Sequence, residues 1–186
     1  MRKELERLEN RRRFYRTVRS TVSVLIVVAA IAVLAASFLF PVLRIYGTSM
    51  APTLSEGDLI LCVRTERAEP GDLIAFYYGN KVLVKRCIAT EGDYVEIDGD
   101  GNVSVNGTLL DEPYLTKKAL GDCDLEMPYQ VPSGRYFVLG DRRESSADSR
   151  NSMIGCISSE QLIGKIRFRI WPLSEFGTVE KTIRSV

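Results

Sequence analysis

One stretch of the sequence, from Thr21 to Phe40, limits the fold more than any other feature. It reads TVSVLIVVAAIAVLAASFLF and contains no charged residue. As an α-helix, a stretch of this length would be about 30 Å long, which matches the hydrocarbon thickness of a bilayer. No other segment approaches the roughly 18 consecutive apolar residues that a span requires. The sequence therefore predicts one transmembrane helix, with membrane lipid as a partner.

The charges beside this stretch predict its orientation. Residues 1–20 contain eight Lys and Arg residues and three Glu residues, a net charge of +5. Because the cytoplasmic flanks of membrane helices are rich in Lys and Arg, we expect residues 1–20 to be a cytoplasmic basic tail. Residues 21–40 would then anchor a single-pass cell-membrane protein, with residues 41–186 as an extracytoplasmic β-rich domain. A cleaved signal peptide is the alternative, but the apolar run and its charged lead are both longer than such peptides usually have.

Composition excludes several functional classes. The chain has no histidine, so it cannot build a Ser-His-Asp triad, a Cys-His pair or a His-ligated zinc site. Since the whole chain has a net charge of +1, the 166 residues after the tail carry −4, which argues against nucleic acid as a partner. We expect no cofactor and no metal. The four cysteines, which include no C-x-x-C pair and leave three disulfide pairings open, are Cys62, Cys87, Cys123 and Cys156.

The outer residues have the pattern of a mostly β body. Short runs rich in β-branched and aromatic residues alternate with turn residues, and helical periodicity is nearly missing. The run of Asp and Gly at 98–101 is typical of a hairpin loop. We therefore expect a mostly β fold, an antiparallel β-sheet body outside the membrane on one N-terminal transmembrane helix. The expected strands are Leu59–Val63, Leu73–Tyr78, Lys81–Ala89, Tyr94–Ile97, Val103–Val105, Tyr136–Leu139 and Ile163–Ile170.

A serine hydrolase without histidine can use a neutral lysine as its base. The pKa of a free lysine is about 10.4, so the protein has to lower it, which burial in an apolar setting can do. In KVLVKRCIA, residues 81–89, period-2 alternation puts Lys85 in a row with Leu83 and Cys87, and Arg86 on the other face. Arginine stays protonated in proteins, so Lys85 is the candidate base. A surface lysine on an edge strand is the alternative.

Two loops supply candidate partners for this lysine. Ser49 lies in YGTSMAPTL, residues 46–54, whose glycine and proline indicate an irregular loop that would expose a hydroxyl group. Residues 140–150, GDRRESSADSR, follow an expected strand. Their small and oppositely charged side chains predict a hydrogen-bonded loop in which Asp148 and Arg150 can pair. An ordinary turn residue and a solvated surface loop are the respective alternatives.

These segments, in this order after one membrane span, resemble the type I signal peptidases, the serine/lysine-dependent leader peptidases, in their compact Gram-positive form. The resemblance covers nearly the whole chain, and the ordered set of motifs is specific although each motif alone is weak. It implies a membrane-bound serine endopeptidase that cleaves N-terminal signal peptides from exported preproteins, which would be its partners. Besides the anchor, it rests on Ser49–Leu54, Gly71–Ile74, Val84–Ala89, Gly92-Asp93 and Gly140–Arg150.

Position by position, the resemblance implies the roles of eight residues. Ser49 would be the nucleophile, with its backbone N–H as an oxyanion donor, and Lys85 would be the general base. Ser146 would hydrogen-bond the lysine amine, while an ion pair between Asp148 and Arg150 would brace the loop. The residues that would line the substrate pocket are Met50, Leu54 and Val84.

The sequence departs from the family pattern at two positions. Gly47 stands where a second oxyanion donor, a hydroxyl, can occur in this family, so the site has one side-chain donor fewer unless Thr48 or a water replaces it. Arg142 stands where the usual Gly-Asp-Asn-Arg motif has Asn.

Three other functional classes make different demands on these residues. A membrane-tethered, non-catalytic β-rich binding or scaffold domain would need neither Ser49 nor Lys85. A self-cleaving Ser/Lys peptidase of the repressor type would share the pair, but its substrates are cytoplasmic regulators. A sortase-like transpeptidase is excluded, because it would need the missing histidine.

Overall fold

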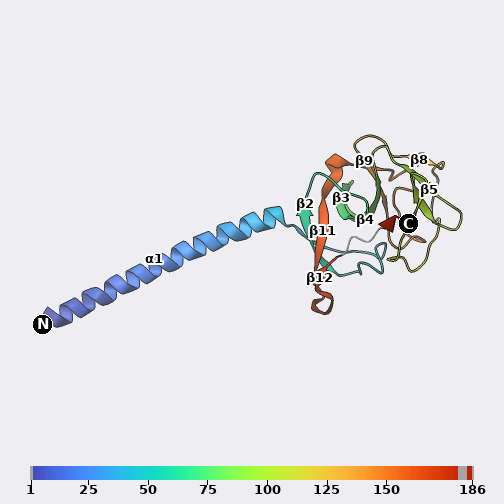
Figure 1. Cartoon of the computed structure of the whole chain (residues 1–186). Helices are drawn as coiled ribbons and strands as arrows, with labels where there is room; N and C mark the ends of the chain where they lie inside the picture. Colours follow the sequence, from blue (N-terminus) through green and yellow to red (C-terminus); the bar gives the residue numbers. More distant parts are fainter. Residues whose placement is uncertain (1, 180–183, 186) are drawn as a thin grey trace. The chain divides into compact units, whose positions relative to one another are not determined.

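The computed structural model describes residues 2–179 and 184–185, and it divides into two compact units after Leu39. The first unit is a single helix, α1 (Arg2–Leu39), drawn in blue in Figure 1. From Arg13 to Leu39 it is long and apolar enough to cross a membrane, and it is the one such helix in the described part of the chain. Helix α1 ends just before Phe40-Pro41, and proline cannot continue a helix because it lacks a backbone N–H.

The second unit contains two antiparallel β-sheets and no α-helix among its described residues. The larger sheet has eight strands, and β12 pairs only with β11 at its side. In spatial order its other strands are β1 (Val42–Arg44), β2 (Leu59–Arg64), β11 (Leu162–Trp171), β3 (Leu73–Tyr78), β4 (Lys81–Thr90), β9 (Arg135–Leu139) and β10 (Ile157–Ser158), with β12 at Gly177–Thr178.

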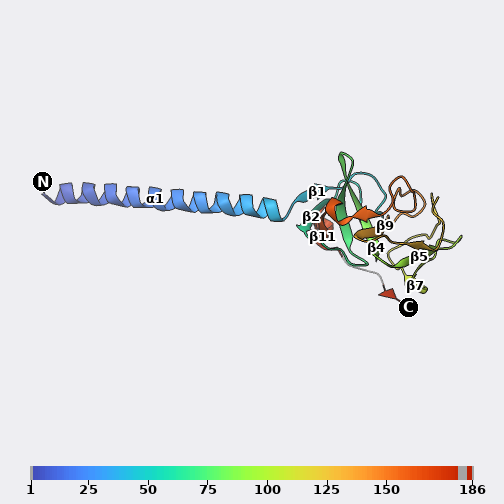
Figure 2. The same ribbon diagram turned by 90° about the horizontal axis from the view of Figure 1, so that it is seen from above.

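The smaller sheet has five strands, and Figures 1 and 2 place its strand β5 on the β9 side of the larger sheet. The hairpin expected at residues 98–101 is present, because β5 pairs antiparallel with β6 across that loop. The strands in spatial order are β13 (Arg184–Ser185), β7 (Thr108–Asp111), β6 (Val103–Val105), β5 (Tyr94–Ile97) and β8 (Tyr129–Gln130). Two short 3₁₀ helices, η1 (Ser159–Gln161) and η2 (Leu173–Glu175), flank β11.

The mostly β, antiparallel fold expected from the sequence is confirmed. Each expected strand is present within about two residues of its predicted ends, which is the usual disagreement in such assignments. The strands that the sequence pattern missed are β1, β7, β8, β10, β12 and β13, each two to four residues long. Runs this short show no alternation, so their pairing is set by neighbouring strands.

The core consists of three clusters of buried apolar side chains. One of them packs Met50 and Leu54 against residues of β2, β3 and β11 and so supports the loop that carries Ser49. Cys62 and Cys156 are buried free thiols, and burial raises the pKa of each to about 11, which keeps them protonated at neutral pH. They therefore serve as small core residues.

The two halves of strand β4 pair with different strands. It pairs with β3 from Lys81 to Arg86, but its pairing with β9 begins only at Arg86. Among the described strands, the stretch Lys81–Lys85 therefore has one unpaired edge. Strand β1 lies at the end of the same sheet and pairs only with β2. The larger sheet therefore has unpaired backbone groups along β1 and along the first half of β4.

Candidate active site

Lys85 is buried in the second unit, with 3% of its surface exposed. Its Nζ donates a hydrogen bond to Ser146 Oγ at 2.9 Å. None of the ion pairs among the described residues includes Lys85. The amine thus has a hydroxyl partner in place of a carboxylate, which favours its neutral form more than an ion pair would.

Burial lowers the pKa of Lys85 from 10.5 to about 8. Desolvation is the largest cause, because a charged amine loses its hydration inside the protein. Arg150 lowers the pKa further, whereas Asp148 and Asp141 oppose the shift. A usable fraction of neutral amine therefore exists near neutral pH.

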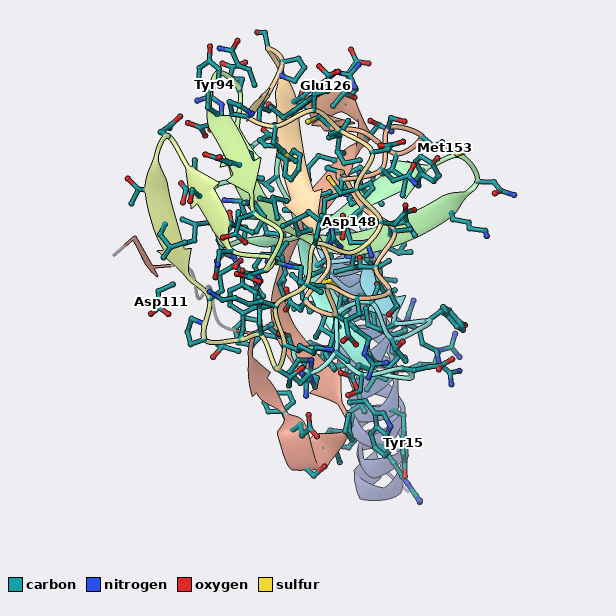
Figure 3. All side chains as sticks on the ribbon, turned by 90° about the vertical axis from the view of Figure 1, so that its right-hand side faces the viewer. Tyr15, Tyr94, Asp111, Glu126, Asp148 and Met153 are labelled. Atoms are coloured by element: carbon teal, nitrogen blue, oxygen red, sulfur yellow. The ribbon has the colours of Figure 1, made fainter. Side chains whose placement is uncertain are left out.

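The loop between β9 and β10 holds Ser146 in place through the predicted ion pair. Asp148 and Arg150 are both 1% exposed and pair in a bidentate way, with Nε–Oδ1 at 2.8 Å and Nη2–Oδ2 at 2.9 Å. Arg150 also donates to the carbonyl of Leu120 at 2.6 Å, and Asp148 Oδ2 accepts the N–H of Gly140 at 2.9 Å. Figure 3 places Asp148 in the interior of the body, away from the peripheral Tyr94 and Met153.

Gly140 is the point at which the three predicted segments meet. A Cβ at this position would overlap the side chain of Ser146 and the carbonyl oxygen of Ser49. That same carbonyl accepts the backbone N–H of Arg142 at 3.0 Å. Since Ser146 is bonded to Lys85, this close packing brings the backbone of Ser49 to the same end of the body as the lysine. Only glycine permits so close an approach.

Ser49 is partly exposed and lines a groove of about 810 Å³. Met50 and Val84, two of the residues expected in the substrate pocket, line it as well. Leu54 does not belong to the described residues that line the groove; it is fully buried in the core cluster that contains Met50. The complete lining consists of residues 42–47, 49–50 and 81–84.

The two departures from the family pattern have different surroundings. Gly47 has a φ of +81°, and a Cβ there would meet nothing within 4 Å, so a hydroxyl side chain would have room but a strained backbone. Arg142 is exposed and contributes its backbone N–H to Ser49. Its side chain therefore replaces Asn at a position that faces solvent.

Comparison with known proteins identifies the family. A family model described as "Signal peptidase, peptidase S26" matches residues 18–171. The chain belongs to this family. It is therefore an enzyme, a serine peptidase, and the non-catalytic scaffold alternative is rejected. With one N-terminal apolar helix, this S26 peptidase is a single-pass, membrane-anchored protein.

Three proteins similar to this S26 peptidase have names that agree with the family model. "Signal peptidase IB" of Staphylococcus aureus (strain Mu50 / ATCC 700699) is 40% identical over 153 residues, 71% of this chain and 78% of the relative. "Signal peptidase I" of Bacillus licheniformis is 34% identical over 170 residues, 83% of this chain and 89% of the relative. A signal peptidase I structure from Enterococcus faecalis V583 has a TM-score of 0.44 and 29% identity, and covers 53% of this chain and 96% of that one. The family model and the two curated relatives confirm the resemblance inferred from the sequence.

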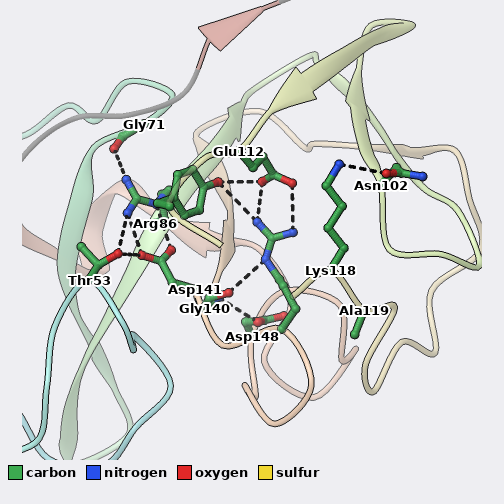
Figure 4. Close-up of polar contacts among 12 residues, drawn as sticks. Thr53, Gly71, Arg86, Asn102, Glu112, Lys118, Ala119, Gly140, Asp141 and Asp148 are labelled. Atoms are coloured by element: carbon green, nitrogen blue, oxygen red, sulfur yellow. Dashed lines mark hydrogen bonds and ion pairs between the residues drawn. The ribbon is translucent and has the colours of Figure 1, made fainter. Parts of the chain in front are cut away.

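Arg86, the residue after Lys85, has no role predicted from the sequence. Arg86 is fully buried, and its Nε and Nη2 donate to the two carboxylate oxygens of Asp141 at 2.9 and 2.6 Å. Thr53, on the Ser49 loop, donates its hydroxyl to the same carboxylate, and Arg86 also donates to the carbonyl of Gly71. This pair, at the left of Figure 4, links β4 to both loops of the site.

Glu112 and Tyr114 complete the buried network. Glu112 accepts from Arg143 at 2.5 Å and from the Tyr114 hydroxyl at 2.6 Å. The Tyr114 ring lies 3.8 Å from the guanidinium carbon of Arg86, a cation–π contact. Arg143 Nε in turn donates to the carbonyl of Gly140 at 3.0 Å. Burial and the neighbouring Glu112 raise the pKa of Tyr114, so its hydroxyl stays a donor.

None of the described residues forms a cluster of three or more His, Cys, Asp or Glu that could hold a metal ion.

The Glu112–Arg143 pair provides a stability test. Glu112→Ala would leave a buried arginine unpaired, so it should lower the free energy of unfolding by about 3–5 kcal/mol. The matched control is Glu144→Ala, which removes an exposed ion pair with Lys117 and should cost less than about 1 kcal/mol. Denaturation of the full chain in detergent, followed by circular dichroism, measures both. Equal losses for the two variants would show that the buried pair is unimportant.

The buried amine itself should be costly for stability. The folded-state pKa of Lys85 lies below the unfolded value, so burial of the charged amine is unfavourable at pH 7, by up to about 3 kcal/mol. Lys85→Met should therefore raise the melting temperature at pH 7, and the gain should shrink as the pH rises from about 8 to 10.5, where wild-type Lys85 becomes neutral in both states. Lys118→Met, at an exposed lysine, is the control and should change little. A gain that did not depend on pH would contradict the electrostatic origin.

Proposed function

We propose that this peptidase cleaves N-terminal signal peptides from exported preproteins with Ser49 as nucleophile and Lys85 as general base. The observation that carries the assignment is the buried Lys85 amine, which is bonded to the Ser146 hydroxyl and follows directly after Lys81–Val84, the part of β4 that lines the groove together with Ser49. Nucleophilic catalysis without histidine requires a desolvated lysine with a lowered pKa and an accessible serine, and the structure has both on this side of the body.

In the proposed reaction, neutral Lys85 takes the proton of the Ser49 hydroxyl while the serine oxygen attacks the scissile carbonyl. The backbone N–H of Ser49 donates to the oxyanion. The protonated amine then gives its proton to the leaving amine, which forms the acyl-enzyme, and a water activated by the same lysine releases the second product. Ser146 orients the amine through its hydroxyl, and Asp148 with Arg150 fixes the loop that carries Ser146.

The substrate would bind in extended form between the two open strand edges. Lys81–Val84 of β4 and Val42–Arg44 of β1 both line the groove and have unpaired backbone groups on one side. A peptide can add to such an edge through main-chain hydrogen bonds, while alternate side chains enter pockets. Met50 and Val84 would form a shallow apolar pocket that selects small residues such as Ala, and Leu54 would support it from the core.

The proposed topology follows from the charge bias of the sequence. Residues 1–20 would lie in the cytoplasm, residues 21–40 in the membrane and residues 41–186 outside, where exported preproteins emerge. Membrane lipid would surround the apolar helix, and the reaction would need no cofactor or metal.

Alanine variants test the proposed roles of Ser49 and Lys85. Purified full-length protein in non-ionic detergent should shorten a precursor that has Ala before the cleavage site. Ser49→Ala and Lys85→Ala should each lower kcat by at least about 10³-fold. Ser146→Ala should reduce kcat, whereas Ser145→Ala, an exposed serine next to it on the same loop, should leave kcat unchanged. An active Ser49→Ala enzyme would disprove the assignment.

The pH dependence tests the base. Because the neutral amine is the reactive form, kcat/KM should fall about tenfold per pH unit below the Lys85 pKa of about 8 and level off above it. Initial rates between pH 5.5 and 9.5 measure this, with circular dichroism to check that the protein stays folded. A flat profile for folded protein would rule out Lys85 as the base.

A further inference from the structure

The groove is apolar except for a few polar groups, and its charged lining residues are all of one sign. Arg44 lines it from β1 and Lys81 from β4, and the described lining residues include no Asp or Glu. The two cations come from different walls of the groove, because its lining consists of two chain segments, one with Arg44 and one with Lys81. These segments belong to β1 and β4, which have three strands between them in the sheet. An apolar groove with cations on both walls attracts negative charge and repels positive charge.

Neither cation is neutralised by the surrounding protein. The ion pairs among the described residues include neither Arg44 nor Lys81. Arg44 instead stacks over Tyr46, with its guanidinium carbon 5.7 Å from the ring centroid. Tyr46 is 78% exposed and also lines the groove. The contact keeps the arginine beside the groove while leaving its charge free to act on a ligand.

The residue spacing along β4 sets the distance between the charge of Lys81 and the scissile bond. Lys81 and Lys85 project to the same face, four residues apart on one strand. At about 3.3–3.4 Å per residue, their backbones are roughly 13 Å apart. A peptide paired along the open edge of β4 advances at the same rate. A substrate residue beside Lys81 is therefore about four residues from the residue beside Lys85, on the side of the scissile bond that extends toward Lys81.

We propose that Arg44 and Lys81 are specificity-determining residues that favour an acidic substrate side chain at this remote position and disfavour Lys or Arg there. The proposal rests on the proposed function, because it assumes that the substrate is cleaved at Ser49 while it occupies the groove. It extends that function by adding a charge preference to the selection of small residues near the cleavage site. Substrate recognition is then electrostatic at one end of the groove and steric at the other.

The size of the preference follows from Coulomb's law. Charges on exposed side chains interact only weakly through solvent, and the exchange of Glu for Lys replaces an attraction to each of the two cations by a repulsion. We therefore expect kcat/KM to be about tenfold higher for Glu than for Lys at low salt. The ratio should fall toward unity at high ionic strength, because these charges are exposed to solvent.

Matched peptides and variants test the proposal with full-length protein in non-ionic detergent. The peptides are quenched fluorescent substrates with Ala immediately before the scissile bond. One set carries Glu, Gln or Lys four residues before that Ala. A second set carries Glu, Gln or Lys four residues after the residue that follows the bond. The variants are Lys81→Ala, Arg44→Ala, the double variant and the charge reversal Lys81→Glu. Lys118→Ala is the control, since it removes an exposed lysine that does not line the groove.

For wild-type protein, the ratio of kcat/KM for the Glu peptide to kcat/KM for the Lys peptide should be about ten at one of the two positions. At that position the ratio should be about three for each single alanine variant, close to one for the double variant and below one for Lys81→Glu. Lys118→Ala should keep the wild-type ratio, and the Gln peptide should be cleaved by all variants. Equal kcat/KM values for the Glu and Lys peptides at both positions would overturn the charge preference while leaving the proposed function intact. If wild-type protein cleaves none of the peptides, the proposed function fails and the charge preference fails with it.

Discussion

The proposed chemistry of this peptidase depends on the removal of one amine from water. Lys85 could serve as the proposed base only because the body desolvates it, and desolvation is the largest cause of its lowered pKa. The strand that carries it is covered at that point by β3 on one edge and by the 140–150 loop at its side chain. Its one hydrogen-bond acceptor in the described structure is a hydroxyl, which orients the amine without restoring the full stabilisation of the cation. Burial of this amine lowers the stability of the folded protein, and the proposed reactivity of Lys85 depends on that burial.

Around this amine, three arginines are buried and each is satisfied by a carboxylate. The pairs are Arg86–Asp141, Arg143–Glu112 and Arg150–Asp148. Buried ion pairs are a poor source of net stability, so their main contribution here is geometric. Bidentate guanidinium contacts fix both distance and orientation, and in this protein they connect β4, the Ser49 loop, the 140–150 loop and the segment that follows β7. These contacts hold the loops that carry Ser49 and Ser146 against β4, the strand that carries Lys85.

The sequence allowed the anchor, the longer strands and several site residues to be predicted, because each has a local signature. The anchor is a run without charge, and Lys85 stands out because histidine is missing and arginine cannot act as a base. Glu112 and Tyr114 could not be predicted, because their partners Arg143 and Arg86 lie 28–31 residues away and the segment between them has no periodic pattern. Alternation along β4 suggested one buried face, whereas Lys85 and Arg86 are both buried, because Ser146 contacts the first and Asp141 and Tyr114 contact the second. Leu54 was expected in the groove because a motif match gives position along the chain but not depth below the surface.

The two open strand edges have a consequence for breadth of recognition. A docked peptide that pairs with β1 and β4 is held mainly through backbone groups, which every preprotein shares. Such a groove can accept many unrelated sequences and needs only a few side-chain restrictions. The same openness makes a strand edge a template for unwanted pairing between protein copies, and lysine on an edge is a common safeguard against it. Lys81, at the start of β4 beside a tight turn, therefore also helps to keep two copies of this domain from joining edge to edge.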